Sequence, residues 1–301
     1  MIQADPTREL CDALAERILV LDGAMGTTIR TYGLNESDAR GERFADSEKD
    51  LLNNGDILSL TRPEVIGDIH KRFYEAGSDI CETNTFSATS IAQSEFFVED
   101  PREKGGRKDP EFFQKIIEDP FLNELAWEMN VESAKLCRKW ADAVGSDTGR
   151  KRYVAGAIGP LTVSLTNSPD ANDPGFRVVN FDQVLDAYKL QIKALIEGGC
   201  DILMIETIFD SLNAKAAAVA VQEVYANTRL GIGPPIKDGF YYDFDPENTF
   251  NPDDLTKIES AMRKIIKEGQ RFKRRVTTEA EALKELAHEP YKCELIGIKG
   301  P

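Results

Sequence analysis

The sequence predicts a parallel α/β fold, and a repeated pattern supports this prediction. Four short apolar segments each end in small or polar residues and are followed by a helix-forming stretch; they span residues 18–23, 79–84, 153–159 and 201–206. Near-continuous apolar runs of this length are typical of parallel strands that are buried on both faces. Alternating strands and helices of this kind build either a barrel or a doubly wound sheet.

The stretches between these segments have helical signatures. One amphipathic helix is expected to begin near Phe181, and an alanine-rich helix is expected over 213–224. The charged stretch 96–119 interrupts the alternation, and we expect a surface insertion there with a short helix near 112–117. The helical pattern resumes over 125–140.

Polar residues at the ends of the expected strands favour the barrel over the doubly wound sheet. Asp22, Glu82 and Glu206 end three of the four segments. A (β/α)8 barrel collects its chemistry at this face from several different strands. A dinucleotide-binding sheet would instead place G-x-G-x-x-G after its first strand, and the turn 22–27 lacks that spacing.

Composition and charge narrow the class of protein. The 301 residues carry a formal net charge of −15, which argues against a nucleic-acid partner, and we expect the basic cluster within 263–275 to be a solvated face. No apolar run reaches the roughly 18–20 residues of a membrane span. The first ten residues include acids and no apolar core, unlike a secretory signal, so a cytoplasmic protein is expected.

Cysteine and histidine are too scattered for a recognisable metal motif. The five cysteines form no C-x-x-C or zinc-ribbon spacing, and there are only two histidines. We therefore expect free thiols, most of them buried.

The pattern changes after Val224. The segment 231–236 is rich in turn residues, and 239–245 is an aromatic run more typical of an antiparallel strand. A helix to about Lys267, a basic strand over 272–277 and a helix over 278–286 are expected to follow. The expected domains are therefore 1–227, a partial barrel, and 228–301, an α+β segment.

Phrases across residues 1–224 resemble the homocysteine-binding domain of cobalamin-dependent methionine synthases. They are RILVLDGAMGT from Arg17, LNE from Leu34, RGERF from Arg40, NNGD from Asn53, EAGSDI from Glu75, ETNTF from Glu82, SPD from Ser168, IETIFD from Ile205 and NAKAA from Asn213. Their order along the chain matches the family. The resemblance implies the first half of a TIM-type (β/α)8 barrel.

The resemblance also implies a substrate and the residues that hold it. In the family, acids at the barrel mouth hold the ammonium group of homocysteine, and the matching residues are Asp22 and Glu206. The substrate carboxylate needs backbone N–H groups and hydroxyls. The residues expected to supply them are Gly23, Thr27, Thr83, Asn84 and Thr85. A plainer interpretation, that acids at strand ends only cap the next helix, stays open, above all for Glu82 and Asn84.

The chain departs from the family at the groups that would activate sulfur. The family binds zinc through three cysteines, one after strand six and an adjacent pair in a Gly-Gly-Cys-Cys-Gly phrase, and zinc makes the substrate thiolate available. None of these cysteines is present, so we expect no tightly bound zinc. The family's methylcobalamin would bind a separate domain, and neither its cobalamin domain nor its folate domain is expected here. A second departure is the run 161–165, where the family has a Thr-Asn pair after Gly-Pro.

The segment from about 229 to 301 resembles the N-terminal editing-type domain of threonyl-tRNA synthetase. The run LGIGPPIKDGFYYDFD from Leu230 carries most of this likeness. The His-x-x-x-His motif of that domain would lie just before it, but 216–227 holds no histidine.

Three interpretations remain at this stage. The chain is a homocysteine S-methyltransferase module that is inactive alone, a non-catalytic fusion or truncated product, or an accessory fragment related to threonyl-tRNA synthetase. Four parallel strands do not close a barrel, so we also expect sheet edges that the tail covers or that promote association.

Overall fold

The computed structural model shows an α/β protein that divides into two compact units, 1–206 and 207–301. The structure describes residues 6–214, 229–230, 235–236, 239–240, 244–245, 264, 276–288, 292–293 and 296. The predicted domain boundary at 227 falls inside the second unit and outside the described residues.

The first unit is built on a parallel sheet, as predicted. Strands β1 (Ile80–Glu82), β2 (Tyr153–Ile158) and β3 (Ile202–Ile205) lie in that order, and both pairings are parallel. The segment before Asp22 extends the sheet beyond β1, because Leu21 bridges Ile80 in parallel. The four apolar segments of the sequence are therefore neighbours in the order in which they occur along the chain.

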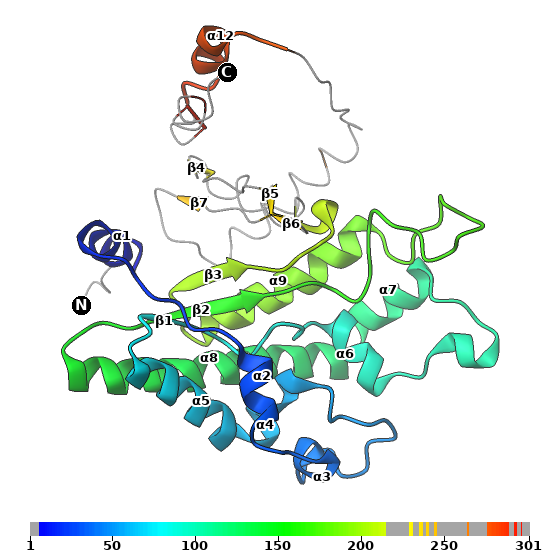
Figure 1. Cartoon of the computed structure of the whole chain (residues 1–301). Coiled ribbons are helices and arrows are strands. Elements are labelled where there is room, and N and C mark those ends of the chain that lie inside the picture. Colours follow the sequence, from blue (N-terminus) through cyan, green and yellow to red (C-terminus); the bar gives the residue numbers. More distant parts are fainter. Residues whose placement is uncertain are drawn as a thin grey trace. The chain divides into compact units, whose positions relative to one another are not determined.

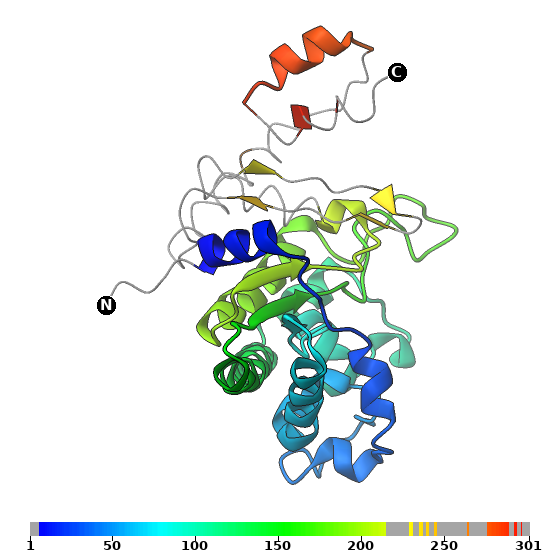
Figure 2. The ribbon, with the colours of Figure 1, turned by 60° about the vertical axis from the view of Figure 1, so that its left-hand side comes forward.

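Three helices form a layer on this sheet: α5 (Pro63–Ala76), α8 (Pro120–Thr148) and α9 (Phe181–Glu197). Figure 1 shows α8 running along the strands beside α5, and in the turned view of Figure 2 both again lie beneath the strands. The shorter helices of this unit are α1 (Pro6–Glu16), α2 (Met25–Arg30), α3 (Glu36–Arg40), η1 (Gly55–Ile57), α4 (Leu58–Thr61), α6 (Ser90–Phe97), η2 (Pro101–Lys104) and α7 (Pro110–Glu118).

The predicted insertion 96–119 contains η2 and α7, and α7 includes the short helix expected near 112–117. The helix expected over 125–140 is longer on both sides. It starts at Pro120, because the side chain of Asp119 accepts a hydrogen bond from the backbone of Leu122 and proline suits the first turn. It ends before Gly149, whose φ of +67° is left-handed.

The core between strands and helices centres on Tyr74 of α5. Its ring is fully buried beside Cys81, Cys137 and Val154. Its hydroxyl donates to the carbonyl oxygen of Tyr153 at 2.8 Å, which satisfies the buried polar group. Helix α5, helix α8 and the first residue of β2 are thus joined around one side chain.

The buried carboxylate of Asp79 holds the sheet edge in place. Arg17 donates to it from both terminal nitrogens at 2.7 Å, and Arg152 donates at 3.2 Å. The backbone N–H of Val20 donates to the same group at 3.0 Å. Hydrogen bonding and the positive charge of Arg17 hold the pKa of Asp79 below its usual value. The segment that leads to Asp22 is therefore fixed beside β1 by a charge as well as by backbone pairing.

The prediction of a first strand buried on both faces is wrong in part. The side chains of Ile18 and Val20 are 88% and 52% exposed, and the segment makes one bridge rather than a regular strand. The reason is its place at the sheet edge, where only β1 pairs with it among the described residues. By contrast, all six residues of β2 are buried, as expected for a central strand.

The second unit is described only in part. Two short antiparallel pairs, β4 (Arg229–Leu230) with β7 (Phe244–Asp245) and β5 (Pro235–Ile236) with β6 (Gly239–Phe240), agree with the antiparallel pattern expected there. Helix α12 (Glu279–Glu285) matches the last predicted helix, with Thr278 as its N-cap. The helices expected over 213–224 and 251–267 and the strand over 272–277 lie almost wholly outside the described residues. No helix within the described ranges is long and apolar enough to cross a membrane.

A buried histidine makes the fold sensitive to acid. His70 of α5 is fully buried, and burial lowers the pKa of its imidazole to about 4. The neutral ring is favoured in the folded state, so stability is lost as pH falls from about 6.5 toward 4, at about 1.4 kcal/mol per pH unit. Between pH 6.5 and 5, we expect the free energy of unfolding of His70→Leu to fall by about 2 kcal/mol less than that of the parent chain. Urea unfolding at both pH values measures this difference, and equal losses in the two proteins would contradict it.

Candidate functional site

Three carboxylates meet at the carboxyl ends of the parallel strands. Asp22 follows the edge segment, Glu82 ends β1 and Glu206 follows β3. The backbone N–H of Glu206 donates to the carbonyl oxygen of Ile158 at 3.1 Å, and that of Asp22 donates to Ile80 at 2.9 Å. Parallel pairing thus places all three residues at the same end of the sheet, where the strands finish. We call Asp22, Glu82 and Glu206 the carboxylate site.

Two contacts show how close the members of the carboxylate site lie. The backbone N–H of Glu82 donates to Oδ1 of Asp22 at 3.0 Å. Glu206 lies close enough to Glu82 for charge repulsion and side-chain hydrogen bonding between them to raise the pKa of Glu82. All three residues are half-buried and can still be reached from solvent.

This crowding changes the charge of the site. Burial raises the pKa of Asp22 to about 6, against the lowering effect of the hydrogen bond from Glu82. Burial raises the pKa of Glu82 further above its usual value, and repulsion by Glu206 and Asp22 adds to this effect. A cation placed among the three oxygens would relieve both the repulsion and the desolvation. The site is therefore suited to an ammonium group.

The turn after Asp22 exposes backbone groups beside the carboxylates. Ala24 has a φ of +53°, a left-handed conformation that is uncommon for a residue with a side chain. Helix α2 then starts at Met25 without a side-chain cap. Gly23 and Thr27 are both exposed. Of the residues predicted to hold the substrate carboxylate, these two are open to a ligand.

Thr83 and Thr85 are buried, and their hydroxyls serve the protein itself. The hydroxyl of Thr85 donates to the carbonyl oxygen of Ala157 at 2.8 Å, and the backbone N–H of Ala157 donates to the hydroxyl of Thr83 at 3.0 Å. The two hydroxyls lie 2.6 Å apart. Because Thr85 gives its proton to Ala157, Thr83 must donate to Thr85. This closed set of hydrogen bonds ties the loop after β1 to β2.

Asn84 is also engaged within the protein. Its amide donates to the carbonyl oxygen of Gly55 at 2.9 Å, and its backbone N–H donates to the hydroxyl of Ser133 at 2.8 Å. The side chain is 4% exposed. Asn84, like Thr83 and Thr85, therefore helps to hold the loop after β1 in place.

Two groups of residues were not predicted from the sequence. Glu82 was left undecided, and its closeness to Glu206 depends on the pairing of β1, β2 and β3. In the sequence, Asp79 is only the first residue of the segment 79–84, whereas in the structure its carboxylate holds the segment before Asp22. No local pattern marks either role. The alternation of apolar and hydroxyl residues over 161–165 does indicate partial burial, and Leu161, Val163 and Leu165 are buried.

Three of the five cysteines lie in surroundings that disfavour a metal-binding thiolate. Cys81 and Cys137 are buried, and burial raises the pKa of each thiol above the usual range. Burial also raises the pKa of Cys200 to about 12. A metal ligand must be a thiolate, which these environments disfavour. Among the described residues, no three His, Cys, Asp or Glu side chains are grouped so that they could hold a metal ion.

A comparison with known protein families places most of the chain in one family. The family model described as homocysteine S-methyltransferase matches residues 19–239. This chain belongs to the homocysteine S-methyltransferase family. The match extends twelve residues past the boundary predicted at 227.

Solved structures of one relative are similar over part of the chain. The metallated form of the homocysteine methyltransferase MmuM from Escherichia coli is 21% identical, with a TM-score of 0.47 over 71% of this chain and 61% of that one. The oxidized form gives the same identity and TM-score, covering 71% of this chain and 60% of that one. The apo form is 20% identical with a TM-score of 0.42, over 71% and 57% of the two chains. The chain thus spans about three fifths of the length of these proteins.

The contacts within the carboxylate site predict an order of pKa changes. Glu206 both repels the side chain of Glu82 and hydrogen-bonds to it, whereas Asp22 repels that side chain and accepts a hydrogen bond only from the backbone of Glu82. We expect Glu206→Gln to lower the pKa of Glu82 more than Asp22→Asn does. Carboxyl-carbon NMR titration of both variants measures this. The reverse order would show that the three side chains are arranged differently.

Proposed function

We propose that this protein binds homocysteine at the carboxylate site, as the substrate-holding part of a methyltransferase that converts homocysteine to methionine. The observation that carries the proposal is the meeting of Asp22, Glu82 and Glu206 at one end of the sheet in a chain of the homocysteine S-methyltransferase family. The ammonium group of the amino acid is the part of the substrate that this charge recognises.

The carboxylate of the substrate accepts hydrogen bonds from the turn after Asp22 in this proposal. The exposed hydroxyl of Thr27 and the backbone at Gly23 lie on the chain directly after the first carboxylate. In this proposal the substrate does not touch the buried residues Thr83, Asn84 and Thr85. They hold the loop after β1 so that Glu82 keeps its place.

The finer assignment is a half of the homocysteine-binding barrel of a cobalamin-dependent methionine synthase. In that reaction the thiolate of homocysteine takes the methyl group of methylcobalamin. The described residues offer no group that activates the sulfur, so we propose that the chain binds the substrate and is inactive alone. The alternative of a non-catalytic fusion product differs only in whether a partner supplies the missing half.

Binding of homocysteine should depend on the carboxylates and on pH. We expect Asp22→Ala and Glu206→Ala each to weaken binding about tenfold or more, because each removes a charge that faces the ammonium group. Affinity should rise as pH increases through about 6, where Asp22 ionises. Isothermal titration at pH 5.5, 6.5 and 7.5 measures both effects.

A matched control removes an acid elsewhere. Glu111 of α7 is an exposed carboxylate whose only ion pair is to Lys115 among the described residues. Glu111→Ala should bind homocysteine like the parent chain. The amine assignment is wrong if the Asp22 and Glu206 variants also bind like the parent while remaining folded.

The metal content of the purified protein tests the absence of sulfur activation. We expect less than stoichiometric zinc after dialysis against a mild chelator, because the buried thiols resist ionisation. Atomic absorption gives the result directly. One zinc per chain that only strong chelation removes would refute this expectation and restore an active enzyme as the better interpretation.

A further inference from the structure

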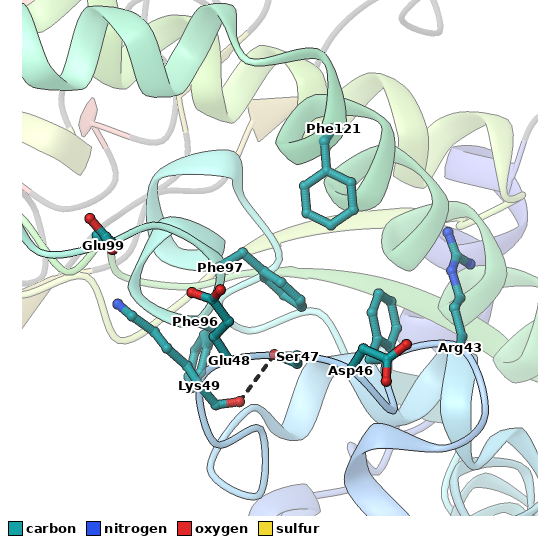
Figure 3. A pocket seen from close by; sticks show the side chains of 10 residues that line it. Arg43, Asp46, Ser47, Glu48, Lys49, Phe96, Phe97, Glu99 and Phe121 are labelled. Atoms are coloured by element: carbon teal, nitrogen blue, oxygen red, sulfur yellow. Dashed lines mark hydrogen bonds between the residues drawn. The ribbon is translucent and has the colours of Figure 1, made fainter.

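A cavity of about 250 Å³ lies in the first unit between the loop 43–49, the end of α6 and the start of α8. None of its lining residues belongs to the carboxylate site. Figure 3 shows the loop residues Asp46, Ser47 and Glu48 on one side and Phe121 on the opposite side, with Phe97 between them. We call this cavity the aromatic pocket.

The apolar wall of the aromatic pocket is a row of phenylalanines. The ring centroids of Phe44 and Phe97 are 5.5 Å apart, and those of Phe97 and Phe121 are 5.4 Å apart. Phe44 is 8% exposed, whereas Phe121 is 47% exposed. The ring of Phe121 therefore exposes a large apolar face to water, and its contact with Phe97 holds it in place. Such a face favours a ligand that can cover it.

Some charged side chains around the rings are already bound to other groups of the protein, and others are exposed without an ion pair. Arg43 is held by Glu128 at 2.7 Å, and Glu99 is paired with Lys104. The ammonium group of Lys49 is turned toward the backbone carbonyl oxygens of Glu95 and Val98. By contrast, Asp46 and Glu48 form no ion pair with any residue that the structure describes, and both are exposed.

Lys49 keeps its positive charge while it donates to carbonyl oxygens, so Lys49, Asp46 and Glu48 together leave one net negative charge at the pocket. A ligand that fits it has a flat face for Phe121 and positively charged N–H donors for the two free carboxylates. A guanidinium group meets both requirements, because it is planar, always charged and presents its donors in a fork. An ammonium group lacks the flat face, and a neutral aromatic group lacks the charge.

The chain itself uses this combination twice. The guanidinium of Arg43 lies 5.2 Å from the ring centre of Phe44 while it contacts Glu128. The guanidinium of Arg107 lies 3.3 Å from the ring centre of Phe176, with Asp173 at 3.9 Å. Both show an arginine placed between a phenylalanine face and a carboxylate. The aromatic pocket likewise combines an exposed phenylalanine, Phe121, with two exposed carboxylates, Asp46 and Glu48.

We propose that the aromatic pocket binds the guanidinium group of an arginine side chain from a partner protein, stacked on Phe121 and hydrogen-bonded to Asp46 and Glu48. An arginine within a polypeptide suits the pocket better than the free amino acid, because the α-carboxylate of the free amino acid would be repelled by the same acids. The pocket thus gives this family member a place to dock a chain that is separate from its substrate site.

The probe for this test is N-acetyl-arginine methylamide, titrated into the full chain and followed by protein NMR shifts. A dissociation constant of about 1–10 mM is the scale expected for one side chain. The citrulline counterpart has the same shape without the charge and should bind at least about tenfold more weakly. Free arginine should bind no more tightly than the blocked probe.

Variants separate stacking from simple apolar cover. Phe121→Leu keeps an apolar side chain without a flat ring and should weaken the arginine probe by about threefold to tenfold. Asp46→Asn with Glu48→Gln should weaken it to a similar degree and remove its salt dependence. Phe112→Leu on α7, a phenylalanine outside the pocket, is the matched control and should leave binding unchanged. Thermal unfolding of each variant confirms that it is folded.

Several results would overturn the proposal. Citrulline and arginine probes that bind equally would show an apolar site without charge recognition. Unchanged binding in folded Phe121→Leu would remove the stacking contact, and no NMR shift at 50 mM probe, about five times the weakest expected dissociation constant, would remove the site. Free arginine that binds about tenfold more tightly would make the ligand a free amino acid rather than a partner protein.

Discussion

The carboxylate of Asp79 is the contact on which the rest of the site depends. It is buried, it binds Arg17 and Arg152, and it accepts the backbone N–H of Val20. A buried charge of this kind is stable only with its partners, so loss of both arginines would leave an unpaired charge in the core. Because the segment before Asp22 is held this way, an edge strand with exposed apolar residues still delivers its carboxylate to the right place.

Holding three acids together has an energetic consequence that a ligand can reverse. The pKa of Asp22 rises to about 6, and that of Glu82 rises further, because burial and mutual repulsion disfavour their charges. An ammonium group supplies the missing positive charge and thereby favours ionisation of the same carboxylates. In the proposed function, recognition of the amine and the raised pKa values are two consequences of one arrangement.

The sequence was sufficient for the parallel order of strands and for Asp22 and Glu206 as candidate residues, because apolar runs and family phrases mark both. It could not show that Thr83 and Thr85 spend their hydroxyls on Ala157, since that depends on the pairing of β1 with β2. It also overestimated the burial of the first strand, because a local apolar run does not reveal that only β1 pairs with it among the described residues. Glu82 gained its importance only from the neighbouring strands.

The most direct test of the central claim compares homocysteine with 4-mercaptobutanoate, which has the same carbon chain, thiol and carboxylate but no amine. If the carboxylate site recognises the ammonium group, isothermal titration at pH 7.5 should show binding of homocysteine, and binding of the desamino compound should be at least about a hundredfold weaker, on the scale of one charge-assisted contact between buried groups. Equal affinity of the two compounds would contradict this account.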